Sequence, residues 1–289
     1  MDTTIESPAG AAGYRPGRTL AYRTEMRRQA ARRRTQLTLG FMVLLPLIVL
    51  VAFEVGGNGG GRDRGQFAAL ASIATAGGLN FALFCLLVSS SFLLIVVVAL
   101  FCGDTVASEA SWGSLRYLLA VPVPRARLLG TKLLAALTYC AIALVLLTGV
   151  ALAAGTLRYG WHPLRSNVSA DIAGGPALWR LLGIVAYLAV SLLIVAGLAF
   201  LLSVSTDAPL GAVGGAVLLQ ILSSILDQIS ALGAIRDFLP THFADAWLGL
   251  LSTPIQATDL AKGSIVALAY AALFFGLAWI RFLRKDVVS

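Results

Sequence analysis

Few side chains in this 289-residue sequence could carry chemistry, and they are widely separated. The two histidines, His162 and His242, have no second ligand at metal-binding spacing, because neither His-x-x-x-His nor Cys-x-x-Cys occurs. Gly113-Ser114 lacks the second glycine of a nucleophile elbow. Gly130-Thr131-Lys132 lacks the first glycine of a phosphate-binding loop. The sequence therefore predicts no catalytic residue, no metal site and no cofactor bound by this chain, which is not expected to be an enzyme.

A polar segment between two long apolar runs has residue types that suit contact with another protein. Placed on a helix, an apolar stripe forms on one face, while Glu109 and Arg116 lie off it. Pro122 and Pro124 would end that helix. We predict a short amphipathic helix at about 105–121 whose charges address a cytoplasmic partner; an ordinary interfacial loop is the alternative. The stripe consists of Trp112, Leu115, Leu118 and Leu119.

A second group of polar side chains follows one face of a later apolar run at three- and four-residue spacing. Polar groups inside a membrane span tend to face a partner or a pathway. We predict that this stripe faces a central cleft between two copies and contacts cargo; alternatively, Asp227 lies at the wet outer end of the helix. The small residues 211–216 at the start of the run predict close helix packing. The stripe consists of Gln220, Ser223, Ser224, Asp227 and Gln228.

Composition indicates that membrane helices position these groups. The chain is 58% hydrophobic and 12% charged with a mean hydropathy of +0.85, whereas soluble domains contain about 25% charged residues. The apolar runs are continuous rather than alternating, which favours helices over barrel strands. The sequence predicts an all-α fold with one six-helix transmembrane domain over 37–289. The expected spans are 37–53, 80–103, 128–157, 178–204, 210–232 and 265–282.

Charge predicts the orientation of these spans. With alternate loops assigned to opposite sides, one side holds 15 of the 22 basic residues and the acids divide evenly. Basic residues near spans are retained in the cytoplasm, so both termini are expected there. The arginine-rich tail, residues 1–36, predicts either a basic helix on the inner membrane surface or a solvated arm. No nucleic-acid motif accompanies the charge, so anionic membrane lipids are the expected partner rather than nucleic acid.

The polar segment resembles a known family signature. The pattern Glu109-x-x-Trp112-Gly113-Ser114-Leu115-Arg116-x-Leu118-Leu119-Ala120-x-Pro122-Val123-x-Arg125, followed by Leu128-Leu129-x-x-Lys132, resembles the cytoplasmic segment between the second and third spans of ABC type-2 permeases. The basic tail and Leu44-Leu45-Pro46-Leu47 are similar to the entry of the first span in actinobacterial members. The two stretches cover about a fifth of the chain, and the signature carries no information on cargo.

The resemblance implies a function and its partners. It implies a multi-pass permease in a bacterial plasma (inner) membrane that exports a drug, antibiotic, lipid or similar cargo. It also implies a separate ATPase subunit that binds ATP and Mg²⁺, and a second permease copy or sister permease. The segment from Glu109 to Arg125 would be the coupling element, with Pro122 in its Leu-Leu-x-x-Pro run.

Two other functions compete with this interpretation. An ion-coupled secondary transporter would need buried acids near the membrane centre and an internal repeat, and the sequence offers neither clearly. A membrane-embedded enzyme would need a nucleophile and a base close together, which the residue inventory does not supply. A gene for an ATPase with Walker motifs beside this one would favour the permease over both.

Overall fold

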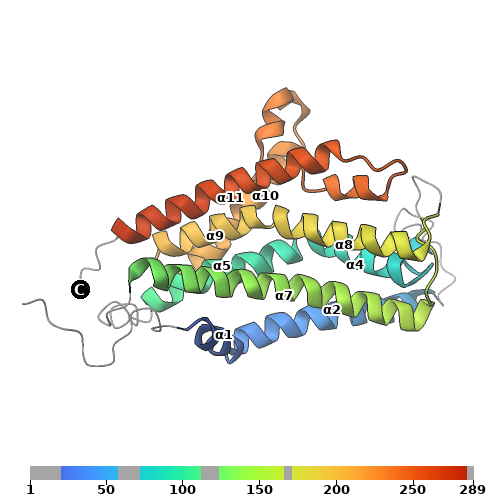
Figure 1. Cartoon of the computed structure of the whole chain (residues 1–289), viewed down its shortest axis with the longest axis horizontal. Coiled ribbons are helices and arrows are strands. Elements are labelled where there is room, and N and C mark those ends of the chain that lie inside the picture. The colour runs from blue at the N-terminus through green and yellow to red at the C-terminus, as the bar shows by residue number, and fades with distance from the viewer. Residues whose placement is uncertain (1–20, 58–71, 112–123, 166–170, 285–289) are drawn as a thin grey trace, which may run out of the picture.

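The structure of the chain is a computed structural model, which describes residues 21–57, 72–111, 124–165 and 171–284. These residues form long helices that run side by side along one axis, as Figure 1 shows. The helices are α1 (Tyr22–Ala30), α2 (Arg33–Gly57), α4 (Gly78–Ser90), α5 (Leu93–Ser111), α7 (Arg125–Tyr159), α8 (Gly174–Ser191), α9 (Leu193–Ser205), α10 (Pro209–Asp227), η2 (Ser230–Phe238), η3 (Ala246–Leu251) and α11 (Thr258–Arg284).

The predicted all-α class is confirmed, and six helices among the described residues are long and apolar enough to cross a membrane. They are α2, α5, α7, the α8–α9 pair, α10 and α11. The start of α2 and the end of α11 lie at the same end of the bundle (Figure 1). That arrangement agrees with an even number of crossings, and the assignment of this end to the cytoplasm stays a prediction.

The helix boundaries differ from those predicted. The second predicted span, 80–103, is two helices, and the second of them continues to Ser111. The fifth span ends at Asp227 rather than at 232, and the sixth begins at Thr258 rather than at 265. Polar residues at the end of α5 and the start of α11 lower the local hydropathy, so the predicted spans omitted these helix ends. Apolar residues after Asp227 extended the fifth predicted span beyond the end of its helix.

Two of the apolar runs are interrupted where serines occur. The hydroxyls of Ser90 and Ser91 both donate to the carbonyl of Leu87, at 3.1 and 3.4 Å, at the junction of α4 and α5. Such bonds compete with the backbone ladder and bend helices. The junction of α8 and α9 also falls after a serine, Ser191. The serines therefore mark the two breaks, which continuous hydropathy concealed.

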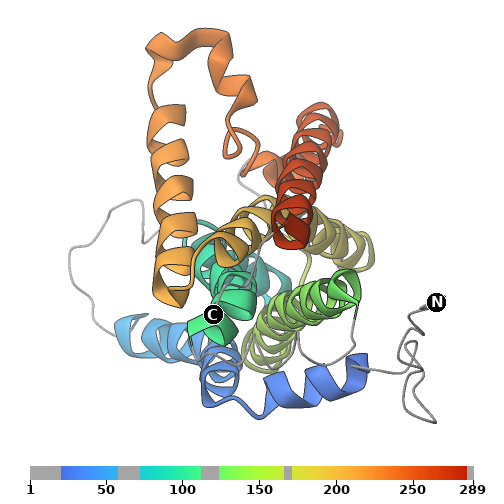
Figure 2. The ribbon, with the colours of Figure 1, turned by 90° about the vertical axis from the view of Figure 1, so that its left-hand side faces the viewer.

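Helix α5 lies at the centre of the bundle, against α7, α9 and α10. Ala212 and Ala216 of α10 are fully buried, which confirms the packing role predicted for the small residues 211–216. A Cβ atom added to Gly103 would lie 3.0 Å from Val213 Cγ2, so glycine permits the close approach of α5 and α10. By contrast, α1 lies across the bundle, and α10 is inclined to the other helices (Figure 2).

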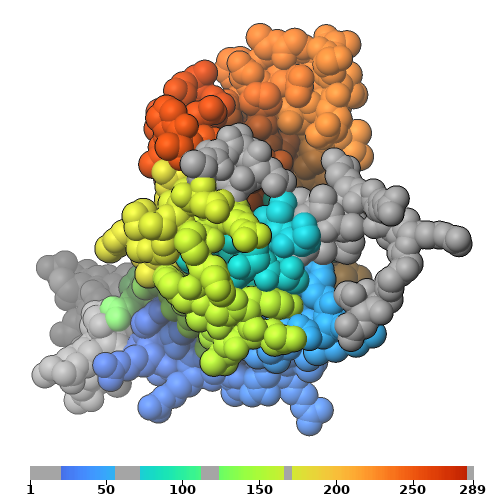
Figure 3. All heavy atoms as spheres, turned by 90° about the vertical axis from the view of Figure 1, so that its right-hand side faces the viewer, coloured from blue at the N-terminus to red at the C-terminus, as the bar shows by residue number. Residues whose placement is uncertain are grey.

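At the far end of the bundle, the connection between α7 and α8 lies against the start of α4 (Figure 3). The Asn80 amide donates to the carbonyl of Arg165 at 2.8 Å and accepts from its N–H at 3.1 Å. Leu164 and Ile172 pair as an isolated bridge within the same connection. These bonds satisfy backbone groups where the chain is not helical, as burial requires.

Candidate functional site

The two charged residues that bound the signature segment meet in the structure. Glu109 lies in the last turn of α5, and Lys132 lies near the start of α7. Lys132 Nζ is 2.5 Å from Glu109 Oε1 and 3.2 Å from Glu25 Oε1 of α1. The side chains of Lys132 and Glu109 are each 2% exposed. The ends of the segment between α5 and α7 are therefore joined by a buried ion pair.

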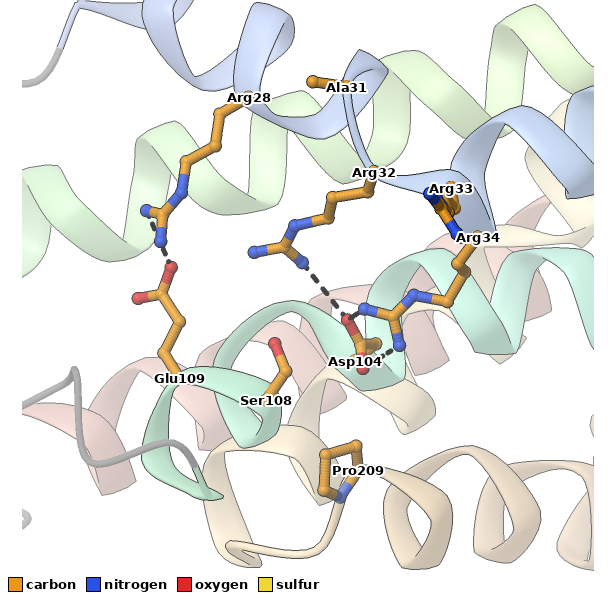
Figure 4. Close-up of a pocket in the computed structure, with 9 residues that line it drawn as sticks. All are labelled: Arg28, Ala31, Arg32, Arg33, Arg34, Asp104, Ser108, Glu109 and Pro209. Atoms are coloured by element: carbon orange, nitrogen blue, oxygen red, sulfur yellow. Dashed lines mark hydrogen bonds and ion pairs between the residues drawn. The ribbon is translucent and has the colours of Figure 1, made fainter.

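Arginines before and at the start of α2 extend this pair into a network (Figure 4). Arg28 Nη1 lies 3.1 Å from Glu109 Oε1. Arg32 lies 3.3 Å from Asp104, one turn further into α5, and Arg34 makes two contacts with the same carboxylate. We call this group the ion-pair cluster; it consists of Glu25, Arg28, Arg32, Arg34, Asp104, Glu109 and Lys132.

The ion-pair cluster holds α1 across the end of the bundle. Charges removed from water are tolerated when they are paired and hydrogen-bonded, and the buried acids here each have a cation beside them. The Tyr139 hydroxyl donates to the carbonyl of Met26 at 2.7 Å, and Tyr22 contacts the Thr138 hydroxyl at 2.7 Å. Polar contacts thus fix α1 against α7. A helix therefore occurs at Tyr22–Ala30 within the basic tail, and its place on the inner membrane surface stays a prediction.

A pocket of about 710 Å³ lies between α1, α2 and the end of α5 (Figure 4). Four arginines and two acids line it. Guanidinium groups bind carboxylate and phosphate oxygens in pairs. The excess of guanidinium over carboxylate groups suits this pocket to an anionic group.

The structure changes the interpretation of the predicted coupling element. Residues 105–111 continue α5 and do not begin a separate helix, so the predicted start of the coupling helix is wrong. Glu109 was expected to address a partner, but its side chain is buried in the ion-pair cluster. Arg125 begins α7 and donates to the carbonyl of Leu283 at 3.4 Å. The remaining predicted residues, Trp112, Gly113, Leu115, Arg116, Leu118, Leu119 and Pro122, lie outside the described residues.

The second predicted group lines a cavity of about 250 Å³, which we call the polar chamber. Residues from α4, α5, α8, α9, α10 and the segment 241–245 form its wall. Both helix breaks open onto it, because Ser90, Ser91, Ser191 and Leu192 are among its lining residues. The chamber therefore forms where two apolar runs are interrupted and where α10 ends.

Charged groups at the end of α10 are paired across the chamber wall. His242 Nδ1 lies 2.7 Å from Asp227 Oδ1, and His242 Nε2 lies 3.2 Å from Asp237 Oδ1. Arg236 Nε lies 3.5 Å from Asp227. Both ring nitrogens therefore face carboxylates, an arrangement in which each can donate only when the imidazole is protonated.

The predicted stripe is brought together at one cavity. Gln220, Ser224 and Asp227 line the polar chamber within this chain, and the expectation that the stripe faces a cleft between two copies stays a prediction. Ser223 is held away by a 2.8 Å hydrogen bond with the Thr241 hydroxyl. Asp227 is the last residue of α10, and it is paired with His242 and Arg236 rather than simply solvated.

Sequence reasoning missed several members of both sites. His242 and Asp245 were assigned to an outer loop, although His242 follows Asp227 closely enough for a short return to pair them. Asp104 was placed only in the polar segment that follows the second predicted span. Its position at the end of a long apolar run, like that of Glu109, was the available signal, because a buried acid there needs a cation.

The comparisons with known proteins identify a family. Residues 43–288 match the family described as "Protein of unknown function (DUF2705)". The chain belongs to this family. The DUF2705 match includes Asp104, Glu109, Lys132 and the polar chamber, and it leaves out α1. No curated protein matches the chain significantly. Membership therefore fixes a multi-span membrane protein without assigning a function.

Proposed function

We propose that the chain is the permease subunit of an ATP-driven ABC exporter in a bacterial inner membrane. In this proposal it works with a cytoplasmic ATPase subunit that binds ATP and Mg²⁺, and with a second copy or a sister permease. The observation that carries the proposal is the buried contact between Glu109 and Lys132, the first and last charged residues of the signature. A segment clamped at both ends can pass a displacement to the two helices that hold it.

The arrangement of α1 supports the same proposal. The ion-pair cluster ties α1, α2, α5 and α7 together at one end of the bundle. A partner that pushes on the segment between α5 and α7 would therefore move a linked set of helices rather than one loop. A ligand or partner changes an equilibrium only through contacts that differ between two states. In this proposal, the contacts of the ion-pair cluster are the ones that differ.

Purification from native membranes tests the proposal. The tagged chain, extracted in a mild maltoside detergent, should bring with it a protein that carries both Walker motifs. The double variant Leu115→Asp, Leu119→Asp should lose that protein while still inserting, because it places charge on the predicted apolar stripe. Leu157→Asp is the control, since Leu157 is exposed at the opposite end of α7. Undiminished recovery of the ATPase with the double variant would contradict the proposed contact.

One observation favours the alternative, an ion-coupled secondary transporter. The paired Asp227 and His242 line the same cavity as Leu94 and Ile95 of α5. At a rise of about 1.5 Å per residue, Leu94 lies about 15 Å along α5 from Asp104, which gives the depth of this pair in the bundle. Ionisable groups at such depth can relay protons. If no protein with Walker motifs co-purifies from native membranes, the permease proposal fails and this alternative takes its place.

A further inference from the structure

The polar chamber contains a buried amide without a partner. Gln220 of α10 is 8% exposed and lines the chamber. No described residue makes a hydrogen bond to its side chain; only its backbone carbonyl is used, by the Ser224 hydroxyl at 3.1 Å. The amide is therefore available to a ligand that enters the chamber.

Acidic groups outnumber basic groups around the chamber. Asp227 and Asp245 line it, and Asp237 adds a third carboxylate through His242. Arg236 and His242 are the basic groups that contact these acids among the described residues. The balance stays negative whether or not His242 carries a proton. A cation is thus favoured in the chamber and an anion is disfavoured.

The helix ends around the chamber add to this preference. The carboxyl end of α10 is at Asp227, where the aligned peptide dipoles of the helix leave partial negative charge. At the two breaks, the carboxyl ends of α4 and α8 are each followed directly by the amino end of another helix, so their fields are offset. Of the three helices that end at the chamber, only α10 is not followed directly by another α-helix. Cation sites in membrane proteins often use the carboxyl ends of such helices.

Another part of the chamber wall is apolar. Leu94 and Ile95 of α5, Leu188 of α8 and Val195 of α9 form it. A bare metal ion would gain nothing from these side chains. A ligand with a charged nitrogen and an apolar body would satisfy both walls at once, and the volume of about 250 Å³ accommodates more than an ion.

We propose that the polar chamber binds an organic ammonium ion, with the charged nitrogen at Asp227 and Asp245, the Gln220 amide oxygen accepting from it, and the apolar body against α5 and α9. The ammonium can come from a free amine or from a lipid headgroup. The role of the chamber as a cargo site rests on the proposed function. Its role as a binding site does not, because binding needs no ATPase.

Binding to the full chain in maltoside micelles tests the proposal, with phenethylammonium as the probe and 2-phenylethanol as the neutral analogue of equal size. Calorimetry or saturation-transfer NMR should show the ammonium binding at least about tenfold more tightly than the alcohol, as expected for hydrogen bonds to charged groups. Equal binding of the two compounds would overturn the proposal. Displacement of the probe by added phosphatidylethanolamine would identify a lipid headgroup as the ligand, and lack of displacement would identify a free amine.

Variants locate the site. Asp227→Asn and Gln220→Leu should each weaken phenethylammonium binding several-fold, whereas Asp171→Asn should not. Asp171 is an exposed acid outside the chamber, so its variant controls for the loss of one negative charge. Asp245→Asn removes a carboxylate from the same wall, at an exposed position where the fold does not depend on the side chain. If Asp171→Asn weakens binding as much as Asp245→Asn does, general surface charge explains the result and the proposed site is wrong. ATPase co-purification is measured separately, so failure of either proposal leaves the other standing.

Discussion

Replacing Lys132 by methionine should destabilise the chain more than the removal of any other single charge at the surface or in a helix. Methionine keeps most of the apolar stem but removes the cation from between Glu25 and Glu109, whose side chains are 6% and 2% exposed. Breaking a buried pair by removing one partner costs about 3–5 kcal/mol. Arg28 remains 3.1 Å from Glu109, so we expect the lower end, about 3 kcal/mol. For a chain of this size that corresponds to a fall in Tm of about 6–12 °C.

Thermal unfolding in maltoside micelles, followed by tryptophan fluorescence, measures this fall. Lys262→Met is the control, because Lys262 is an exposed lysine of α11 and its loss leaves no buried acid behind. The double variant Lys132→Met, Glu109→Gln should be more stable than Lys132→Met alone, since it removes one of the two carboxylates that lose the lysine, although Arg28 still contacts both. A Tm for Lys132→Met within about 2 °C of that of Lys262→Met would refute the assignment of Lys132 to a buried network.

Two further predictions use matched pairs of positions on one helix. Gly155→Ala should destabilise the chain by about 1–3 kcal/mol, because its new Cβ would lie 2.8 Å from Phe81 Cβ. Gly149→Ala should be neutral or slightly stabilising, because no atom lies within 4 Å of its new Cβ. A comparison of the two Tm values checks both. Ser203→Ala should destabilise by about 1–3 kcal/mol, because the fully buried Ser203 hydroxyl accepts two backbone N–H groups of α5 at 3.0 Å. Ser205→Ala should not, since the Ser205 hydroxyl donates only within α9, and equal effects of the two serine variants would contradict the inter-helix role.

The membrane class and the number of long helices could be predicted from the sequence because hydropathy is a local property. Each apolar run produces its own signal, whatever it packs against. The breaks at Ser91 and Leu192 were not predicted, because they leave mean hydropathy almost unchanged. At the first break, the Ser90 hydroxyl bonds to the carbonyl of Leu87 in the preceding turn, a contact that hydropathy does not register.

The candidate sites could be predicted only in part, for a similar reason. Gln220 and Asp227 share a helix face, and that periodicity is visible in the sequence. Their partners Thr241 and His242 come from a return of the chain that has no periodic signal. In the ion-pair cluster, Glu25 and Lys132 are separated by more than a hundred positions, so only the fold brings them together.

Helix α5 connects the two candidate sites physically. Its first turn supplies Leu94 and Ile95 to the polar chamber, and its last turns supply Asp104 and Glu109 to the ion-pair cluster. No break falls between these positions, and close contact at Gly103 and Val213 joins α5 to α10, which carries Gln220 and Asp227. Movement of the end of α5 that the ion-pair cluster holds would therefore shift the apolar part of the chamber wall together with its polar part. Because coupling between two sites is reciprocal, a ligand that fits the chamber better in one position of α5 would also favour one state of the cluster.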